Sequence, residues 1–494
     1  MRVKYWKGRM KNVQVVTISL LFPFVLLAQW WPNVRLTNDP AISRTSYNNA
    51  RCVASSGSYV HVVWWDWPYG LGIHYNRSTD NGGTWETDTI PTNTVVSGFP
   101  SIAVSGGNVH LVWQDERDGN DEIYYNRSFD NGISWETDMR LTNNIAASCY
   151  PSIAVCGSNL HVVWYDGRDG NYEIYYKRST DNGANWSEDI RLTNNSGYSY
   201  CPSIAVSGSN VHVIWYDNRD GNYEIYYKRS TDNGANWSED IRFTVDTAGS
   251  WNPSIAVCGL NVHVVWRDDR DGIRGEIYYK NSLDNGISWS LDTRLTNNPT
   301  ESQYPSMSVS GSNVHLVWCN YYDGNYEIQY KHSFDNGTIW SADTMLTNDT
   351  AWAWCPSVAV SGSCVHIVWM DSYNGNNGNE EIYYKRNPTG NYCIEENKSP
   401  ISAQLFILKI FPNPVKSLTV IRYSLPTEGK ISLQLFDISG RLVKALVNQE
   451  KNTGNYSLIW NGTDENNRKV GEGVYFCILK TNGKCLKQKI LMIK

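Results

Sequence analysis

Hydrophobic and polar positions along the chain follow a pattern that repeats about every 51 residues. Each repeat holds four short runs, exemplified by PSIAVSG, VHVVWYD, EIYYKRS and DIRLTNN, in which apolar and polar side chains alternate. Alternation with a period of two is typical of half-buried strands, and four antiparallel strands in this length predict one blade of a β-propeller. The second run occurs seven times, and its histidines mark the repeats: His61, His110, His161, His212, His263, His315 and His366.

The two ends of the repeat array predict how the ring closes. The seventh repeat has three of its four runs and then breaks at Asn387 and Pro388. Residues 33–39, NVRLTND, match the fourth run that this repeat lacks. We therefore expect the N-terminal segment to complete the last blade, which pairs both edges of the sheet. The sequence predicts an all-β chain with a seven-bladed propeller over residues 29–388, and six or eight blades are the alternatives.

A motif of the form Ser-x-Asp-x-Gly-x-x-Trp follows the third run in six repeats. Its Asp and Ser oxygens suit hydrogen bonds from local backbone N–H groups, its Gly permits a positive φ, and its Trp packs on the blade. The motif is the Asp box, or BNR repeat, and residues 29–388 resemble the sialidase-like superfamily of Asp-box propellers. We expect a structural role for its residues: Asp80, Asp130, Asp181, Asp232, Asp284, Asp335, Trp85, Trp135, Trp186, Trp237, Trp289 and Trp340.

Strand alternation separates the loops into two faces. The Asp boxes share one face with the turns between runs one and two, and the DxRDGN loops between runs two and three lie on the opposite face. The resemblance implies that this opposite face carries the functional site. Aromatic rings stack on sugars and carboxylates bind their hydroxyl groups, so we expect glycan or protein binding there. The candidates are Arg117, Arg168, Arg219, Arg270, Phe99, Tyr150, Tyr200, Trp251, Tyr304 and Trp354.

A structural alternative exists for each of these candidates. Each arginine follows an aspartate by two residues and could simply pair with it, as Arg117 with Asp115. The aromatic residues could simply pack between adjacent blades. The same loops supply Glu122, Glu173 and Glu224, whose oxygens would suit calcium. An arginine in the middle of the loop favours an ion pair instead, so no cofactor is expected and calcium is left as an alternative.

Arg51 is the one candidate for catalysis. It stands at the start of a first run where the other repeats have Pro, and in sialidases an arginine at the matching place belongs to a triad that binds the substrate carboxylate. The later repeats carry Pro-Ser at this place, and an active site needs different residues from different blades. The near-identical repeats favour a non-catalytic binding propeller. The alternative is a sialidase-like glycoside hydrolase, of the exo-α-sialidase type, that uses Arg51.

The N-terminal segment predicts export. Residues 1–28 combine five basic side chains with an apolar stretch and end at Ala28, which is typical of a signal peptide, with an uncleaved anchor as the alternative. No later segment is apolar enough to span a membrane. The net charge of −6 argues against nucleic acid as a partner. The chain has 11 Cys, and this odd number leaves their disulfide pairing open.

The chain changes character after the repeats. Residues 389–405 are polar and indicate a linker, and residues 406–494 alternate like the strands of a small Ig-like β-sandwich. This segment resembles the C-terminal sorting domain of type IX secretion cargo in its PNP opening, its Asp437-x-x-Gly440-Arg441 turn and its Gly473-Val474-Tyr475 run. An ordinary Ig-like adhesion module is the alternative. The resemblance implies the type IX machinery as a partner and a secreted or outer-membrane-surface location in a Gram-negative-type bacterium.

Overall fold

The computed structural model consists of two compact units, residues 1–394 and 395–494. The described residues are 30–38, 41–47, 50–67, 72–92, 96–272, 274–372, 380–390, 407–411, 415, 419–425, 428–452, 454–466, 468–481 and 484–493. The predicted signal peptide, most of the predicted linker and the PNP opening lie outside them. In the described part of the chain, no helix is long and apolar enough to cross a membrane.

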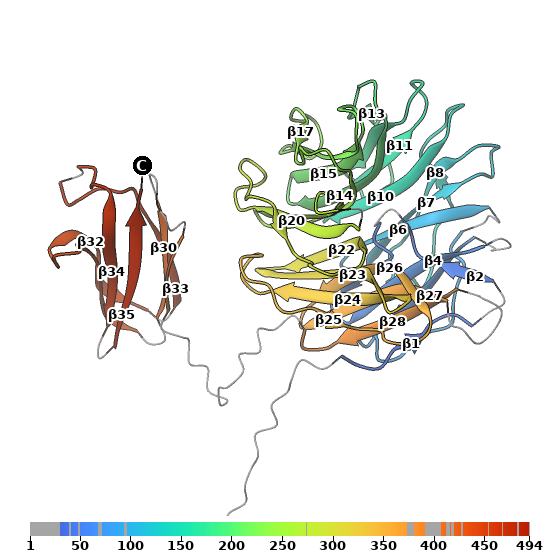
Figure 1. Cartoon of the computed structure of the whole chain (residues 1–494). Coiled ribbons are helices and arrows are strands. Elements are labelled where there is room, and N and C mark those ends of the chain that lie inside the picture. The colour runs from blue at the N-terminus through green and yellow to red at the C-terminus, as the bar shows by residue number, and fades with distance from the viewer. Residues whose placement is uncertain are drawn as a thin grey trace, which may run out of the picture. The chain divides into compact units, whose positions relative to one another are not determined.

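The first unit is a ring of seven antiparallel sheets, as predicted (Figure 1). The strands are grouped by blade. Blade one has β2 (Ile42–Arg44), β3 (Val53–Ser56), β4 (Tyr59–Trp67) and β5 (Ile73–Ser78); blade two has β6 (Ser97–Ser105), β7 (Asn108–Asp115), β8 (Glu122–Ser128) and β9 (Met139–Arg140); blade three has β10 (Ser148–Cys156), β11 (Asn159–Asp166), β12 (Glu173–Ser179) and β13 (Ile190–Arg191). Blade four has β14 (Ser199–Ser207), β15 (Asn210–Asp217), β16 (Glu224–Ser230) and β17 (Ile241–Arg242); blade five has β18 (Ser250–Cys258), β19 (Asn261–Asp268), β20 (Glu276–Ser282) and β21 (Thr293–Arg294). Blade six has β22 (Ser302–Ser310), β23 (Asn313–Tyr322), β24 (Asn325–Ser333) and β25 (Thr344–Met345); blade seven has β26 (Trp352–Ser361), β27 (Cys364–Ser372), β28 (Glu381–Asn387) and β1 (Val34–Arg35).

The ring closes with the N-terminal strand, which confirms the expectation for residues 33–39. Val34 and Arg35 of β1 pair with Tyr384 and Tyr383 of β28. The Arg35 side chain also forms an ion pair with Glu381 of the same blade. Because this strand comes from the opposite end of the propeller, blade seven joins the two ends of the ring by backbone hydrogen bonds.

The hydrophobic core lies between neighbouring blades. The second strands of the blades each bury one tryptophan completely, as Trp164 of β11 shows. Trp164 packs in one cluster with Ile123 and Tyr125 of blade two. Each sheet is therefore covered on both faces by its neighbours, which explains why the second run is nearly all apolar.

A repeated contact joins each blade to the next, and we call it the latch. In blade three, His161 Nδ1 lies 2.7 Å from the Tyr176 hydroxyl. The Tyr176 ring meets the Asp-box tryptophan of blade four, Trp237, edge to face at 4.9 Å. Arg178 of blade three donates to the backbone oxygen of Asn233 in that same box, at 2.6 Å. The histidine at the centre of each repeat therefore orients the tyrosine that holds the neighbouring Asp box.

The N-terminus supplies the latch that the seventh blade lacks. Six Asp-box tryptophans cover the latch tyrosines of six blades, and Tyr330 of blade six remains. The Trp30 ring meets Tyr330 edge to face, with ring centroids 4.8 Å apart and an interplanar angle of 78°. Trp135 meets Tyr75 in nearly the same way, at 5.0 Å and 80°. Trp30 thus takes the place of a seventh Asp-box tryptophan.

The second unit is a small Ig-like β-sandwich, as predicted. One sheet has the order β29-β30-β33 and the other β32-β31-β34-β35. Leu433, Leu435, Trp460 and Cys477 are buried in the core that the two sheets enclose. The domain boundaries inferred from the sequence stay predictions. The strands are β29 (Ile407–Phe411), β30 (Thr419–Leu425), β31 (Gly429–Asp437), β32 (Leu442–Lys451), β33 (Gly454–Trp460), β34 (Gly473–Thr481) and β35 (Lys484–Met492).

The latch predicts different costs for two glycine substitutions in blade four. Gly234 of the Asp box has φ +80°, and an added Cβ would lie 1.8 Å from the Tyr176 hydroxyl oxygen. Gly208 has φ +61° with nothing within 4 Å of an added Cβ, so it controls for the backbone strain alone. We expect Gly208→Ala to lower the free energy of unfolding by about 1 kcal/mol and Gly234→Ala by about 2 kcal/mol more. Urea unfolding measures both, and equal losses would contradict the latch.

The buried latch histidines predict a loss of stability in mild acid. Burial lowers the pKa of His61 to about 3 and that of His212 to about 4. Between these values and the ordinary value of 6.5, the unfolded chain binds protons that the folded chain does not. Stability is therefore lost as pH falls below about 6.5, by up to about 1.4 kcal/mol per pH unit for each histidine. The melting temperature, measured from pH 7.5 to pH 5, checks this.

One carboxyl group changes stability with pH in the opposite direction, and it offsets the contribution of one of these histidines. Burial raises the pKa of Asp371 to about 7, so its contribution to stability is lost as pH rises. In the matched variant His212→Gln, the folded and unfolded states differ by about one proton less. We therefore expect the slope of the unfolding free energy against pH to fall by about 1.4 kcal/mol per pH unit. A melting temperature that stays constant down to pH 5 would contradict the prediction.

Candidate functional site

The Asp boxes occupy one face of the propeller, which we call the Asp-box face. The Asn182 N–H in the blade-three box donates to the Ser158 oxygen of the turn between strands one and two, at 3.0 Å. Asp181 accepts hydrogen bonds from Ser179 and from the backbone and side chain of Asn185, and these bonds lower its pKa to about 2. The box carboxylates are thus engaged in holding their own turns.

The loops between strands two and three lie on the opposite face, together with the connections between blades. We call this the binding face. The Gly167 N–H donates to the Ala147 oxygen of the connection that enters blade three, at 3.1 Å. The Asn171 side chain likewise donates to the Asn195 oxygen of the next connection, at 3.0 Å. Both sets of loops therefore meet at one end of the sheets.

The four candidate arginines of the binding face are held in local ion pairs. Arg168 contacts Asp166 at 2.6 Å and Asp189 at 2.7 Å, and its guanidinium lies 4.3 Å from the centre of the Tyr175 ring. The same arrangement of two carboxylates and a ring surrounds the other three: Arg117, Arg219 and Arg270. Their positive charge is neutralised within the blade, which is the structural alternative raised from the sequence.

Blade seven shows what the arginine does for its aspartate. Arg168 helps to lower the pKa of Asp166, against the effect of burial. Asp371 occupies the same place in blade seven, where the loop has no arginine, and burial there raises its pKa to about 7. The arginines of the other blades therefore serve as counter-charges for buried carboxylates.

The loop glutamates do not fit a calcium site. Glu122 forms an ion pair with Arg140 at 2.8 Å, and it also accepts from the Thr142 hydroxyl and from the Asn144 N–H. Glu173 and Glu224 are engaged by the matching arginines of their own blades. Among the residues that the structure describes, no group of three or more His, Cys, Asp and Glu side chains is placed to hold a metal ion.

The candidate aromatic residues fall into two positions. Phe99, Tyr150 and Tyr304 precede a proline directly and have φ between 53° and 54°, where the first strand shifts its register against the second. Phe99 and Tyr150 come from adjacent blades but stack with ring centroids 4.2 Å apart. Tyr200, Trp251 and Trp354 stand one residue earlier and contact the side chains of the preceding blade, as the 5.3 Å contact of Tyr200 with Tyr165 shows.

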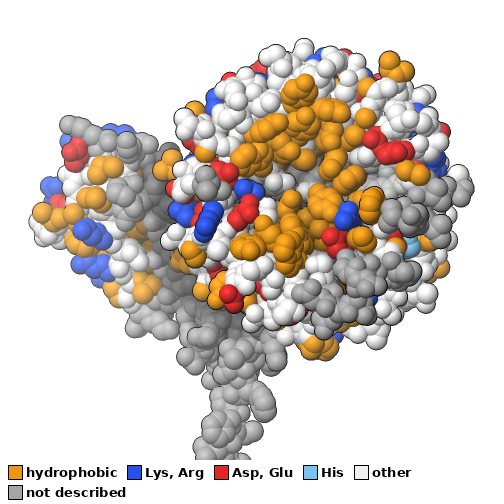
Figure 2. Space-filling model, turned by 45° about the vertical axis from the view of Figure 1, so that its right-hand side comes forward, with side chains coloured by type: hydrophobic (Ala, Val, Ile, Leu, Met, Phe, Trp, Pro, Cys, Tyr) orange, Lys and Arg blue, Asp and Glu red, His pale blue; other side chains and the backbone are white. Residues whose placement is uncertain are grey.

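Tyr200 is the centre of a large aromatic cluster. Its ring lies 5.5 Å from Tyr172, 5.9 Å from Tyr198 and 5.7 Å from Tyr216. The Tyr198 side chain is 43% exposed. Figure 2 shows one face of the propeller, on which hydrophobic side chains gather in large groups with charged side chains between them. We call the cluster the aromatic shelf: Tyr165, Tyr172, Tyr198, Tyr200, Tyr216, Tyr223 and Trp251.

Most shelf residues were missed in the sequence, although a signal for them exists. Tyr172 and Tyr223 stand in the loops GNYE of blades three and four, at the same spacing as the repeat. Tyr165 and Tyr216 follow the buried tryptophan of the second run. The alternation of the strands shows that these residues recur, but it does not show that rings from three blades meet.

A pair of carboxyl groups stands beside the shelf. Glu116 and Asp121 of the blade-two loop interact, and burial together with the Asp121 charge raises the pKa of Glu116. The Cys149 thiol is 3.8 Å from Asp121 on the side of the shelf. Carboxyl oxygens next to exposed rings suit the hydroxyl groups of a sugar.

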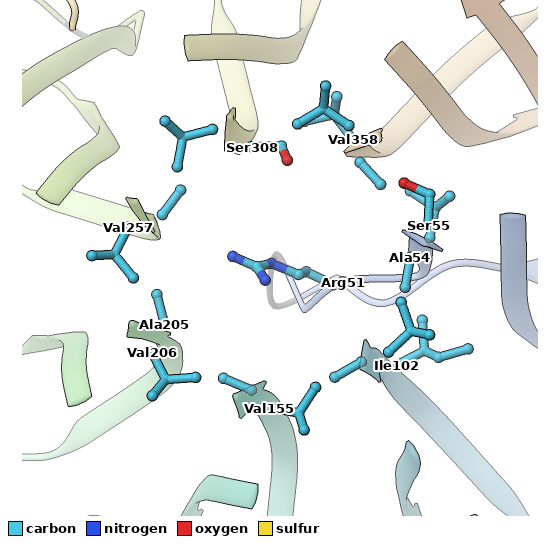
Figure 3. Close-up of a pocket in the computed structure, with 18 residues that line it drawn as sticks. Arg51, Ala54, Ser55, Ile102, Val155, Ala205, Val206, Val257, Ser308 and Val358 are labelled. Atoms are coloured by element: carbon cyan, nitrogen blue, oxygen red, sulfur yellow. The ribbon is translucent and has the colours of Figure 1, made fainter. Parts of the chain in front are cut away.

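Arg51 points into the central channel of the propeller (Figure 3). Between Arg44 and Cys52 the sequence of blade one is longer than the two residues Phe99 and Pro100 at the matching place in blade two. The Ser46 hydroxyl in this segment donates to the Pro100 oxygen at 2.6 Å. The Arg51 guanidinium reaches across to the Ile255 oxygen of blade five, at 3.4 Å. Burial lowers its pKa.

The channel around Arg51 is narrow, and the side chains that line it are small and mostly apolar. Its walls are Ala, Val, Ile and Ser side chains of the first strands, and it has a volume of about 190 Å³. Among the described residues that line it, Arg51 is the single charged one. No second arginine and no carboxylate stand beside it there, so the arginine triad and the Tyr–Glu pair of a sialidase are not assembled by the described lining.

The comparison with protein families concerns the second unit. Residues 409–494 match the family described as secretion system C-terminal sorting domain. The protein is exported by type IX secretion. Its destination is the cell surface or the extracellular space. No curated protein sequence matches the chain.

Solved structures resemble the propeller in fold. An ulvan lyase, from a new family of polysaccharide lyases, bound to -[GlcA(1-4)Rha3S]-, is 12% identical, covers 71% of this chain and 95% of its own, and gives a TM-score of 0.54. A second structure, of a polysaccharide lyase of this type, gives 0.53 with the same identity and shares. A Trypanosoma rangeli sialidase gives 0.42 at 10% identity, with 83% of this chain and 85% of its own covered. At 12% identity the two lyase structures show the fold alone.

Export predicts a simple deletion phenotype. Removal of residues 406–494 takes away the sorting domain and leaves every strand of the propeller in place. We expect the shortened protein to stay in the periplasm of the producing bacterium, folded, while the full chain reaches the surface or the medium. Cell fractionation with an antibody to the propeller measures this, and secretion at an unchanged level would contradict it.

Proposed function

We propose that the protein is an exported carbohydrate-binding propeller that binds glycans on its binding face. The aromatic shelf is the observation that carries this proposal. Rings from three consecutive blades meet there, and Tyr198 presents 43% of its surface to solvent. Ring faces pack against the C–H surfaces of sugars, and the phenol hydroxyls bind sugar hydroxyl groups.

The rings of the aromatic shelf are more exposed than rings that only pack the blades together. The latch rings on the Asp-box side are buried, as Tyr176 is, because they fill the space between blades. Tyr172, Tyr198, Tyr200 and Tyr223 are all at least partly exposed, although they pack against neighbouring rings. Partly exposed rings in one continuous cluster are typical of recognition surfaces.

The arginines and the fold contribute less to the proposal. The four loop arginines are already paired with carboxylates, so we assign them to the stability of the loops and leave the ligand to the rings. The ulvan lyase acts on a polysaccharide but shares the fold alone. A protein ligand is the other reading of the same face, and the binding test below distinguishes the two.

Arg51 supports a second candidate function, a sialidase-like glycoside hydrolase. It is a guanidinium inside the channel with no carboxylate beside it among the described lining residues. A negatively charged sugar substituent would suit it. The proposal ranks second because the described lining supplies no acid, base or nucleophile near Arg51.

Glycan binding predicts a loss on removal of one exposed shelf ring. The full chain is applied to an array of plant, algal and animal glycans, and its dissociation constant is then measured for the glycan bound best. We expect Tyr198→Ala to weaken binding about tenfold, because the ring loses its contact with the sugar, and Tyr198→Phe to keep most of the affinity. Phe129→Ala, on an exposed ring of the Asp-box face, is the matched control and leaves binding unchanged.

Two outcomes would count against this function. Failure to bind any glycan, with the melting temperature intact, would overturn it in favour of a protein ligand. Turnover of a fluorogenic sialoside that is lost in Arg51→Ala would favour the hydrolase.

A further inference from the structure

The side-chain contacts of the aromatic shelf continue toward blade six through an ion pair. At the edge of the shelf, the Arg267 guanidinium lies 5.3 Å from the centre of the Trp251 ring and forms an ion pair with Glu301 at 2.7 Å. Glu301 also accepts a hydrogen bond from the Tyr326 hydroxyl at 3.0 Å. The Tyr326 ring of blade six then contacts Trp354 of blade seven, with centroids 4.4 Å apart.

A second group of rings follows at blades six and seven. Tyr326 lies 5.9 Å from Trp352 and 5.1 Å from Tyr321, and Trp352 lies 5.6 Å from Trp354. Trp352 is 42% exposed and Tyr321 is 37% exposed. We call these four residues the far group. Like the shelf, it consists of rings that are held by their neighbours but open to solvent.

The shelf, the Arg267–Glu301 pair and the far group form one arc. The arc begins at Tyr165 of blade three and ends at Trp352 of blade seven, so it runs over five of the seven blades. A terminal monosaccharide covers one or two rings. Rings repeated at consecutive blade boundaries suit a ligand that itself repeats, because each added unit gains a contact at no further cost in translational freedom.

The charges along the arc narrow the class of ligand. Glu116, Asp121, Asp269 and Glu301 lie beside the rings, against the single guanidinium of Arg267, which contacts both Asp269 and Glu301. In the loop after β19, the Arg274 side chain donates to the Pro299 oxygen, and the Arg51 guanidinium lies inside the channel rather than on the arc. The whole chain has a net charge of −6. An excess of carboxylates repels polyanions and leaves acceptors for hydroxyl groups.

We propose that the ligand is a linear, uncharged polysaccharide whose sugars lie along this arc from blade three to blade seven. The proposal rests on the proposed function and adds length and charge to it. It differs from binding of a chain end: the shelf and the far group each hold part of the same polymer, and the Arg267–Glu301 pair contacts the sugars between them.

The test compares polymers and then oligomers on the full chain. Affinity gel electrophoresis with xyloglucan, laminarin and mannan as uncharged polymers, and with alginate and chondroitin sulfate as anionic ones, shows the charge preference. For the polymer that is bound best, calorimetry then follows its oligosaccharides from the dimer to the octamer. We expect affinity to rise at least about tenfold between the trimer and the hexamer.

Two single substitutions at the ends of the arc test whether one ligand spans it. We expect Trp352→Ala in the far group and Tyr198→Ala in the shelf each to weaken the octamer about tenfold. The trimer should lose less than threefold in either variant, because the opposite end still binds it. Phe129→Ala on the Asp-box face serves as the control for both.

The outcomes separate this proposal from the one on which it rests. Affinity that is already maximal for the dimer, or binding of the anionic polymers alone, overturns the linear uncharged ligand and leaves glycan binding standing. An octamer affinity that Trp352→Ala does not change also overturns it. Failure of every polymer to bind overturns the linear ligand, and failure to bind any glycan on the array as well overturns both proposals.

Discussion

The contact between a latch tyrosine and the Asp box of the next blade is the interaction on which the whole ring depends. A propeller blade has two apolar faces, and no blade can bury both without neighbours on either side. The hydroxyl of Tyr176 fits only because Gly234 has no side chain, and His161 fixes the hydroxyl from within the sheet. Six copies of this arrangement, with Trp30 in place of a box against Tyr330, join the seven blades into the ring.

This dependence divides the molecule into a uniform face and a varied one. On the Asp-box face, the polar side chains hold their own turns by hydrogen bonds, as Asp181 does with Ser179 and Asn185. The binding face also pairs its charged groups, as Arg168 does with Asp166, but its strand ends and loops differ more between blades. Tyr, Trp, Cys, Arg and Gln occur there at equivalent places in different blades, and the resulting surface is asymmetric although the repeats are nearly alike.

The sequence predicts the scaffold well because alternation, turn residues and the missing fourth run are local signals. The blade count, the closing strand and the two faces are confirmed. The site is harder to predict. Tyr200 contacts Tyr165 of the preceding blade beside a register shift and a positive φ at Cys201, directly before a proline, and simple alternation does not predict either. The second carboxylate on Arg168, Asp189, comes from 21 residues away and is placed by the fourth strand. Trp30 carries no repeat pattern, so its role follows only from three-dimensional packing.

Ring closure by Val34 and Arg35 has a consequence for how long the folded protein persists. Strand β1 is synthesised first, but its partner β28 follows some 350 residues later in the chain. Because the closing contact is so non-local, we expect it to form late in folding. Contacts that form after the folding transition state slow unfolding more than they speed folding. We therefore expect the rate at which β1 separates from β28 to set the lifetime of the folded protein outside the cell. The contact of Trp30 with Tyr330 holds the same N-terminal segment in place.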